Sequence, residues 1–129
     1  MNHPFNASSG PILVDAEISG PAGKARATLV LDTGATASTI NISVLRSAGY
    51  DPNLSTDFVQ MMTGTGTGVT KVPRVILNRM SALGQYQIGI RVLAHDLPLV
   101  ANVDGPLGLD FLRDQVLTID FRAATMNLV

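Results

Sequence analysis

The chain has 129 residues, of which 46% are hydrophobic and 15% charged, and its formal net charge is −1. This composition excludes an intrinsically disordered chain, which combines low hydrophobicity with high charge, and the near-zero net charge argues against a dedicated nucleic-acid binder. The length fits a single domain, and the lack of cysteine excludes disulfides, thiol nucleophiles and thiolate metal sites.

The N-terminal part of the chain is predicted to form a hairpin followed by a short helix. Apolar residues alternate with polar ones over 12–18 and 25–31, which is typical of two strands joined by a glycine-containing turn. Ser43 offers an N-cap for a helix over 44–48, and Gly49 would end that helix in a left-handed conformation.

The middle of the chain is predicted to form two more hairpins. Strands over 58–63 and 69–77 flank a glycine-rich tip at 64–68. A further hairpin is expected over 75–94, with its turn near 83–85. These segments leave little room for helix.

The C-terminal part is predicted to contain a short helix over 109–113 and two strands over 116–121 and 125–129. Many short strands with little helix predict an all-β barrel or sandwich. We expect residues 1–10 to be a flexible N-terminal segment and residues 11–129 to be a single domain.

One tripeptide, Asp32-Thr33-Gly34, stands out because it directly follows an apolar strand. A charge is costly in such a place unless it is used or paired. Gly34 would allow a close backbone approach or a positive φ, and Thr33 can hydrogen-bond the backbone locally. The alternative interpretation is a strand that simply ends in an Asx turn.

The segment 32–35, Asp-Thr-Gly-Ala, resembles the active-site motif of the retropepsin-like aspartic proteases, a single-domain family that includes retroviral proteases and bacterial relatives. A second segment, 106–112, is similar to the apolar segment with glycine that leads into a short helix in that family. The glycine-rich tip at 64–68 stands where the family has its substrate-covering flap. The resemblance extends over 12–129.

The resemblance implies an all-β, closed retropepsin-like barrel with a flap hairpin and one or two short helices, completed by homodimerisation. It implies an aspartic endopeptidase in which two carboxylates share a proton and activate water, without metal or organic cofactor. Since the chain has one Asp-Thr-Gly motif, the second catalytic aspartate must be Asp32 of another subunit. Asp110 is interpreted as a helix-capping or structural residue.

The resemblance also implies roles for residues around Asp32. The hydroxyl of Thr33 would brace the paired loops, and Gly34 and Ala35 would shape the floor of the cleft. Met61 and Met62 flank the flap tip as ordinary strand residues or as adaptable apolar contacts for a peptide. The residues expected to bind substrate are Val30, Met62, Gly64, Gly66, Asp104, Pro106 and Gly108.

The chain departs from the retroviral pattern at two positions. Retroviral members often carry an arginine after the late glycine and an aspartate after Asp-Thr-Gly-Ala, whereas this chain has Leu109 and Thr36 there. We therefore expect a dimer held by apolar contacts and terminal strands, and a greater similarity to the bacterial members of the family.

Other chemistries have less support. The tip at 64–68 lacks the spacing, the lysine and the following helix of a phosphate-binding loop. A zinc site or a Ser-His-Asp triad would have to rest on His95, because His3 lies in the N-terminal segment, and 95–98 is interpreted as a loop.

Two functional alternatives stay open beside the peptidase. The first is a catalytically silent domain of the same fold that serves dimerisation or peptide binding, and the second is a zymogen-like form whose N-terminal segment blocks assembly. The expected partners are a second copy and a peptide or protein substrate, with no nucleic acid and no membrane segment in this chain. The compartment is left open, as cytoplasmic, or periplasmic if a signal or anchor was removed.

Overall fold

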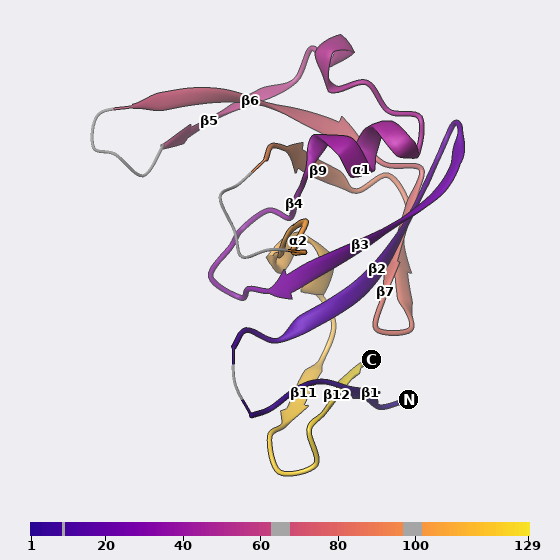
Figure 1. Cartoon of the computed structure of the whole chain (residues 1–129), viewed down its shortest axis with the longest axis vertical. Helices are drawn as coiled ribbons and strands as arrows, with labels where there is room; N and C mark the ends of the chain where they lie inside the picture. Colours follow the sequence, from indigo (N-terminus) through magenta and orange to yellow (C-terminus); the bar gives the residue numbers. More distant parts are fainter. Residues whose placement is uncertain (9, 63–67, 97–101) are drawn as a thin grey trace.

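The computed structural model describes residues 1–8, 10–62, 68–96 and 102–129. The described strands pair into three sheets, with the orders β1-β12-β11, β10-β3-β2-β7-β8 and β4-β9-β6-β5. The two termini lie together at one end of the molecule, and the β5–β6 hairpin extends from the other end (Figure 1). The predicted all-β class is confirmed, whereas closure of these sheets into a barrel stays a prediction.

The elements are short, as the sequence predicted. In chain order they are β1 His3–Pro4, β2 Leu13–Gly20, β3 Gly23–Leu31, β4 Thr39–Ile40, α1 Ile42–Ser47, the 3₁₀ helix η1 Pro52–Leu54, β5 Phe58–Met62, β6 Val69–Ile76, β7 Arg79–Ala82, β8 Gln85–Gln87, β9 Arg91–Ala94, β10 Gly105–Leu107, α2 Leu109–Leu112, β11 Leu117–Asp120 and β12 Thr125–Leu128. None of the helices in the described ranges is long and apolar enough to span a membrane.

The β2–β3 hairpin forms as predicted and supplies one wall of the core. Its antiparallel register pairs Val14 with Leu29 and Ala16 with Ala27. These four side chains are buried, together with Ile18, because alternate residues of both strands point to the same face of the sheet. The hairpin thereby fixes the position of the end of β3, where Asp32 follows.

Helix α1 begins two residues earlier than expected, so the prediction of Ser43 as its N-cap is wrong. Asn41 is the cap, and its Oδ1 accepts a hydrogen bond from the backbone N–H of Val44 at 2.9 Å. Ser43 lies within the first turn and donates its hydroxyl to the same Oδ1 at 2.9 Å. The predicted end is confirmed, since Gly49 follows the helix with φ +96°.

The hairpin predicted over 75–94 is also confirmed, and it belongs to two sheets. Strand β6 pairs with β9, and β7 pairs with β8, in one continuous register. The outer pair lies in the four-stranded sheet and the inner pair in the five-stranded sheet. Leu83 and Gly84 form the turn with φ 53° and 75°, which is the left-handed conformation that a two-residue hairpin turn requires.

Residues 3–5 lie within the N-terminal segment 1–10 that was expected to be flexible, and they contact the C-terminal hairpin. Residues His3–Pro4 pair with β12, where His3 faces Met126. The backbone N–H of Phe5 donates to Ala124 O at 2.9 Å, and its ring meets that of Phe121 edge-on at 5.5 Å. These contacts hold residues 3–5 to the C-terminal hairpin.

Candidate active site

The parallel pairing of β3 and β10 brings the two sequence motifs together. Leu31 at the end of β3 lies beside Leu107 at the end of β10, and the backbone N–H of Asp32 donates to Leu107 O at 3.0 Å. Because parallel strands end at the same edge of a sheet, Asp32 and Gly108 emerge side by side. Polar and reactive groups of open sheets commonly sit at such an edge.

Asp32 begins a tight loop, residues 32–38, which we call the Asp32 loop. Its Oδ1 accepts a hydrogen bond from Gly34 N–H at 3.0 Å, and its backbone O accepts one from Ala35 N–H at 3.1 Å. A Cβ at Gly34 would lie 3.2 Å from Asp32 Oδ1, which is a tight contact, and the expected role of Gly34 in the cleft stays a prediction. The Asx turn is present as well, so the two interpretations of the motif are compatible.

The side chain of Asp32 is exposed at the sheet edge, as are Thr33 and Gly34, while Ala35 is half-buried. An exposed carboxylate on a turn that is fixed by its own backbone hydrogen bonds can be reached by a substrate or by a second protein copy. The loop therefore presents Asp32 in a defined place without burying its charge.

Helix α2 holds the Asp32 loop through backbone hydrogen bonds. Leu109 N–H donates to Ala35 O at 2.8 Å, and Asp110 N–H donates to Thr36 O at 3.2 Å. Gly108 is buried, and a Cβ at this position would lie 2.6 Å from Ala35 O. The glycine is thus required for the close packing of the two motifs, and the structure places it beneath the Asp32 loop.

The far end of the Asp32 loop is fixed by a pair that sequence reasoning missed, Ser38 and Asp110. Ser38 is fully buried, and its N–H and Oγ–H donate to the two carboxylate oxygens of Asp110 at 2.8 and 2.7 Å. Its Oγ also accepts from Gly108 N–H at 2.9 Å. The interpretation of Asp110 as a structural residue is confirmed by these contacts. Nothing in the local sequence around Ser38 indicates its partner.

Asp104, expected to bind substrate, has both carboxylate oxygens engaged in holding elements together. Oδ2 accepts from Thr28 N–H at 2.8 Å, and Oδ1 accepts from Asn41 Nδ2 at 2.6 Å. Its contacts join β3 to the start of α1. The expected contact of Asp104 with substrate stays a prediction. Val30 and Pro106 are half-buried and face each other across β3, which leads to Asp32, and β10, which leads to Gly108; their expected contacts with substrate stay predictions.

The arms of the expected flap form the β5–β6 hairpin, which is paired as far as Met62 and Val69. Met61 is half-buried. The side chain of Met62, and the whole of Gly64 and Gly66, lie outside the described residues. Their expected contacts with substrate therefore stay predictions.

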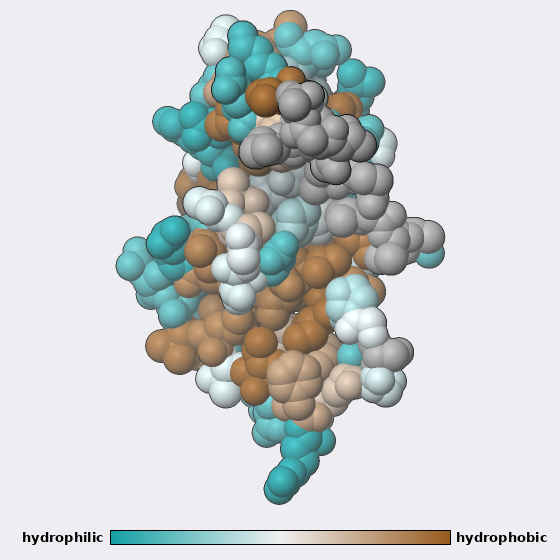
Figure 2. All heavy atoms as spheres, turned by 90° about the vertical axis from the view of Figure 1, so that its left-hand side faces the viewer, coloured by the Kyte–Doolittle hydropathy of each residue, from teal (hydrophilic) through white to brown (hydrophobic). Residues whose placement is uncertain are grey.

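Apolar side chains lie beside the Asp32 loop, whose own residues Thr33 and Thr36 are polar and exposed. The loop that follows β3 lies on the left-hand side of Figure 1, and Figure 2 shows the molecule from that side, with hydrophobic residues gathered across its middle. Leu13 is 43% exposed, and the half-buried Ile12 and Leu31 lie next to Asp32 with a backbone hydrogen bond of 2.9 Å between them. Contiguous apolar surface of this kind marks a contact site for a partner or a ligand.

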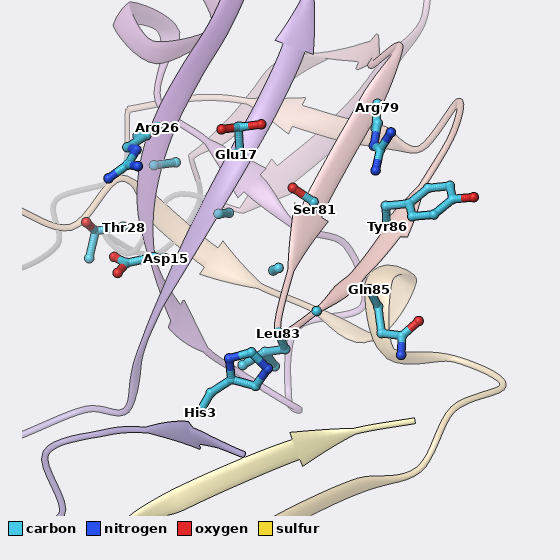
Figure 3. A pocket seen from close by; sticks show the side chains of 14 residues that line it. His3, Asp15, Glu17, Arg26, Thr28, Arg79, Ser81, Leu83, Gln85 and Tyr86 are labelled. Atoms are coloured by element: carbon cyan, nitrogen blue, oxygen red, sulfur yellow. The ribbon is translucent and has the colours of Figure 1, made fainter. Parts of the chain in front are cut away.

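A hollow of about 710 Å³ lies on the outer face of the five-stranded sheet. Figure 3 shows charges of both signs around it, with Glu17 from β2, Arg26 from β3 and Arg79 from β7. Arg79 stacks over the ring of Tyr86, 4.2 Å from its centroid. The Asp32 loop contributes none of the lining residues, so this hollow is separate from the candidate active site.

His95 and Asp96 lie outside helices and strands, as interpreted from the sequence, whereas residues 97 and 98 of the expected loop lie outside the described residues. His95 N–H donates to Ile40 O at 3.2 Å, and Asp96 Oδ1 accepts from Ile42 N–H at 2.8 Å at the start of α1. Within the part of the chain that the structure describes, no three histidine, aspartate or glutamate side chains are grouped as metal ligands.

Comparisons with known proteins agree with this geometry. A family model described as aspartyl protease matches residues 14–111, a stretch that includes the Asp32 loop and all but the last residue of α2. The chain belongs to the aspartyl protease family. The crystal structure of a retropepsin-like aspartic protease from Rickettsia conorii matches with a TM-score of 0.71 and 18% identity, covering 99% of this chain and 89% of that one. The expected retropepsin-like fold is therefore confirmed. No curated protein sequence gives a significant match.

Proposed function

We propose that this aspartyl protease family member is an active endopeptidase that works as a homodimer, with Asp32 of each subunit meeting across a two-fold axis. The observation that carries the proposal is the exposed Asp32 carboxylate at the joint end of β3 and β10, fixed by Leu107 and Gly34. One chain has one Asp-Thr-Gly motif, so the second carboxylate would come from Asp32 of a second subunit related by a two-fold axis.

The chemistry follows from two carboxylates held about 3 Å apart, which cannot both ionise and so share one proton. The ionised Asp32 takes a proton from a water molecule as its oxygen attacks the scissile carbonyl carbon. The protonated Asp32 gives its proton to the carbonyl oxygen. As the C–N bond breaks, the protonated Asp32 gives its proton to the leaving nitrogen, and the other Asp32 takes a proton from a hydroxyl of the tetrahedral intermediate, whose C=O re-forms. The pair again shares one proton.

Other residues of the site take supporting roles in this proposal. The hydroxyl of Thr33 braces the two Asp32 loops against each other, and Ala35 forms part of the cleft floor. The flap tip closes over an extended peptide and adds main-chain hydrogen bonds. The proposed substrate contacts are Val30, Met62, Gly64, Gly66, Asp104, Pro106 and Gly108.

Apolar contact is the proposed basis of the dimer. Leu13 is exposed beside the half-buried Ile12 and Leu31, and a second copy would cover this surface while bringing the two Asp32 loops together. The uncharged Leu109 and Thr36 leave no charge to neutralise at the positions where retroviral proteases often carry an ion pair. The dimer is therefore expected to tolerate high salt, because salt screens exposed charges and does not weaken apolar contacts.

The test compares wild type with Asp32→Asn on a mixed peptide library between pH 3 and 8. The amide keeps the shape of the side chain and removes the acid and base, so cleavage should fall by at least about 10²–10⁴-fold. Thermal melting should be preserved, since an exposed carboxylate is replaced by an isosteric amide. Asp120→Asn is the control, because that carboxylate accepts two backbone hydrogen bonds of 2.9 Å in the distant β11–β12 turn.

Three outcomes would contradict the proposal. Equal cleavage by wild type and Asp32→Asn would remove Asp32 from the chemistry. A wild type that is folded and dimeric by sedimentation, yet cleaves no peptide under any condition tried, would favour the silent dimerisation or peptide-binding module. A strict monomer with full peptidase activity would exclude the shared site.

A further inference from the structure

The carboxylate of Asp110 collects hydrogen bonds from two segments far apart in the sequence. It accepts from the N–H and Oγ–H of Ser38, 72 residues away, and its Oδ1 also accepts from Phe111 N–H at 2.9 Å. All three partners are donors, which suits an ionised carboxylate because that group accepts hydrogen bonds without donating any. An isosteric amide at this position would place its own N–H groups against at least one of them.

The same pair belongs to a set of hydrogen bonds that holds the Asp32 loop. Ser38 Oγ accepts from Gly108 N–H at 2.9 Å, and the next two N–H groups, of Leu109 and Asp110, donate to Ala35 O and Thr36 O. The loop is thus held at its start by Leu107, in its middle by α2, and at its end by Ser38 and Asp110.

We propose that Asp110 and Ser38 are positioning residues that set the place of the Asp32 carboxylate in the reaction. This inference rests on the proposed peptidase function. Neither side chain would touch substrate, since Ser38 is fully buried and Asp110 lies beneath the Asp32 loop. They act through the backbone of Ala35 and Thr36.

Symmetry makes the reaction sensitive to this pair. A displacement of the Asp32 loop in one subunit is repeated in the other, so the separation of the two carboxylates changes by contributions from both. A mutation far from the reacting atoms that misplaces the reacting groups by about 1 Å can lower a rate by about 100-fold. Loss of the Ser38–Asp110 pair should therefore affect turnover more than substrate binding, which uses the strands and the flap.

The test uses Asp110→Asn and Ser38→Ala, with Tyr50→Phe as the control for a loss of stability alone. The hydroxyl of Tyr50 donates to Ser19 O at 2.6 Å and accepts from Asn78 N–H at 2.7 Å, so its removal breaks two structural hydrogen bonds away from the Asp32 loop. We expect Asp110→Asn and Ser38→Ala to lower kcat by about 10- to 100-fold with KM within about twofold. Tyr50→Phe should melt at a lower temperature and keep its kcat.

Amide hydrogen exchange supplies a readout that needs no activity. In both positioning variants, exchange at Ala35, Leu109 and Asp110 should rise by at least about tenfold, because local opening of the loop becomes easier. Exchange in the β2–β3 ladder, for example at Ala16, should stay unchanged. In Tyr50→Phe the three loop and α2 amides should exchange as in wild type.

Several results would overturn the inference. One is a variant that keeps full kcat, and another is exchange that rises evenly over the whole chain, which would show a general loss of stability. Dissociation of the dimer in the variants, seen by sedimentation at the assay concentration, would assign the effect to assembly. If wild type itself never cleaves peptide, the proposed function fails, and exchange then decides by itself whether the pair holds the loop.

Discussion

Substitution of Gly108 by alanine tests how closely the two motifs must pack. Its φ is −102°, which alanine adopts freely, so the effect of the substitution is purely steric. The added Cβ would lie 2.6 Å from Ala35 O and 2.9 and 3.0 Å from the carbonyl C and O of Ala37. Backbone has to move, and the hydrogen bonds from Gly108 to Ser38 and from Leu109 to Ala35 lengthen or break.

The expected cost can be assembled from these contacts. Overpacking costs about 1–3 kcal/mol, and each weakened hydrogen bond costs about 0.5–1.5 kcal/mol. Reduced freedom of the unfolded chain offsets about 0.4–1 kcal/mol of this. Taking the middle of each range and two weakened hydrogen bonds, we expect Gly108→Ala to lower the free energy of unfolding by about 3 kcal/mol, which corresponds to a fall in Tm of about 10–12 °C.

Urea and thermal unfolding of a glycine series measure this effect. Gly89 has φ +72° and open space around it, so Gly89→Ala should show backbone strain alone, about 1 kcal/mol. Gly105 combines φ +149° with a Cβ that would run into Thr39 O, and Gly105→Ala should be the most destabilised. A Gly108→Ala protein as stable as Gly89→Ala, or with wild-type exchange at Leu109, would refute the close packing of the two motifs.

Three further predictions concern hydrogen bonds and an ion pair outside the Asp32 loop, each checked by urea unfolding. Tyr50→Phe should lower the free energy of unfolding by about 1–3 kcal/mol, because Ser19 O and Asn78 N–H each lose a hydrogen-bond partner, at about 0.5–1.5 kcal/mol per bond. Asn41→Ala should cost a similar amount, since it removes both the cap of α1 at Val44 and the partner of Asp104; a loss below about 0.5 kcal/mol would contradict this. Lys24→Ala should change stability by less than about 1 kcal/mol, because its 3.4 Å ion pair joins side chains that are 71% and 40% exposed.

Local patterns in the sequence were sufficient to predict most strands and turns. The β2–β3 hairpin follows from the alternation that buries Val14, Ala16, Ala27 and Leu29, and the β7–β8 turn follows from the glycine at position 84. Such signals are local because a strand pair joined by a short turn places its partners close in sequence. Asp32 was identifiable for the same reason, since the apolar strand, the aspartate and the glycine are consecutive.

The N-cap of α1 could not be predicted from the residues of its first turn alone. Ser43 and Asn41 are both good N-caps by residue type, and the choice depends on where the preceding chain enters. Asn41 N–H donates to Asp104 O at 2.8 Å, and its side chain reaches the carboxylate of the same residue. These bonds fix the backbone before the helix, so Asn41 becomes the cap and Ser43 enters the first turn.

The support of the active site depends on pairing that no local pattern contains. Ser38 and Asp110 meet because β3 and β10 run parallel, and a parallel pair needs a long crossover between its strands. The aspartate that bears the proposed chemistry can be found from neighbouring residues, because it needs exposure at a turn. The carboxylate of Asp110, at the far end of the Asp32 loop, is engaged with Ser38, 72 residues away. Asp104 likewise joins distant segments, β3 and the start of α1, and its expected contact with substrate stays a prediction. The position of Asp32, to which we assign the proposed chemistry, therefore depends on residues such as Ser38 and Asp110, whose role becomes visible after the strands are paired.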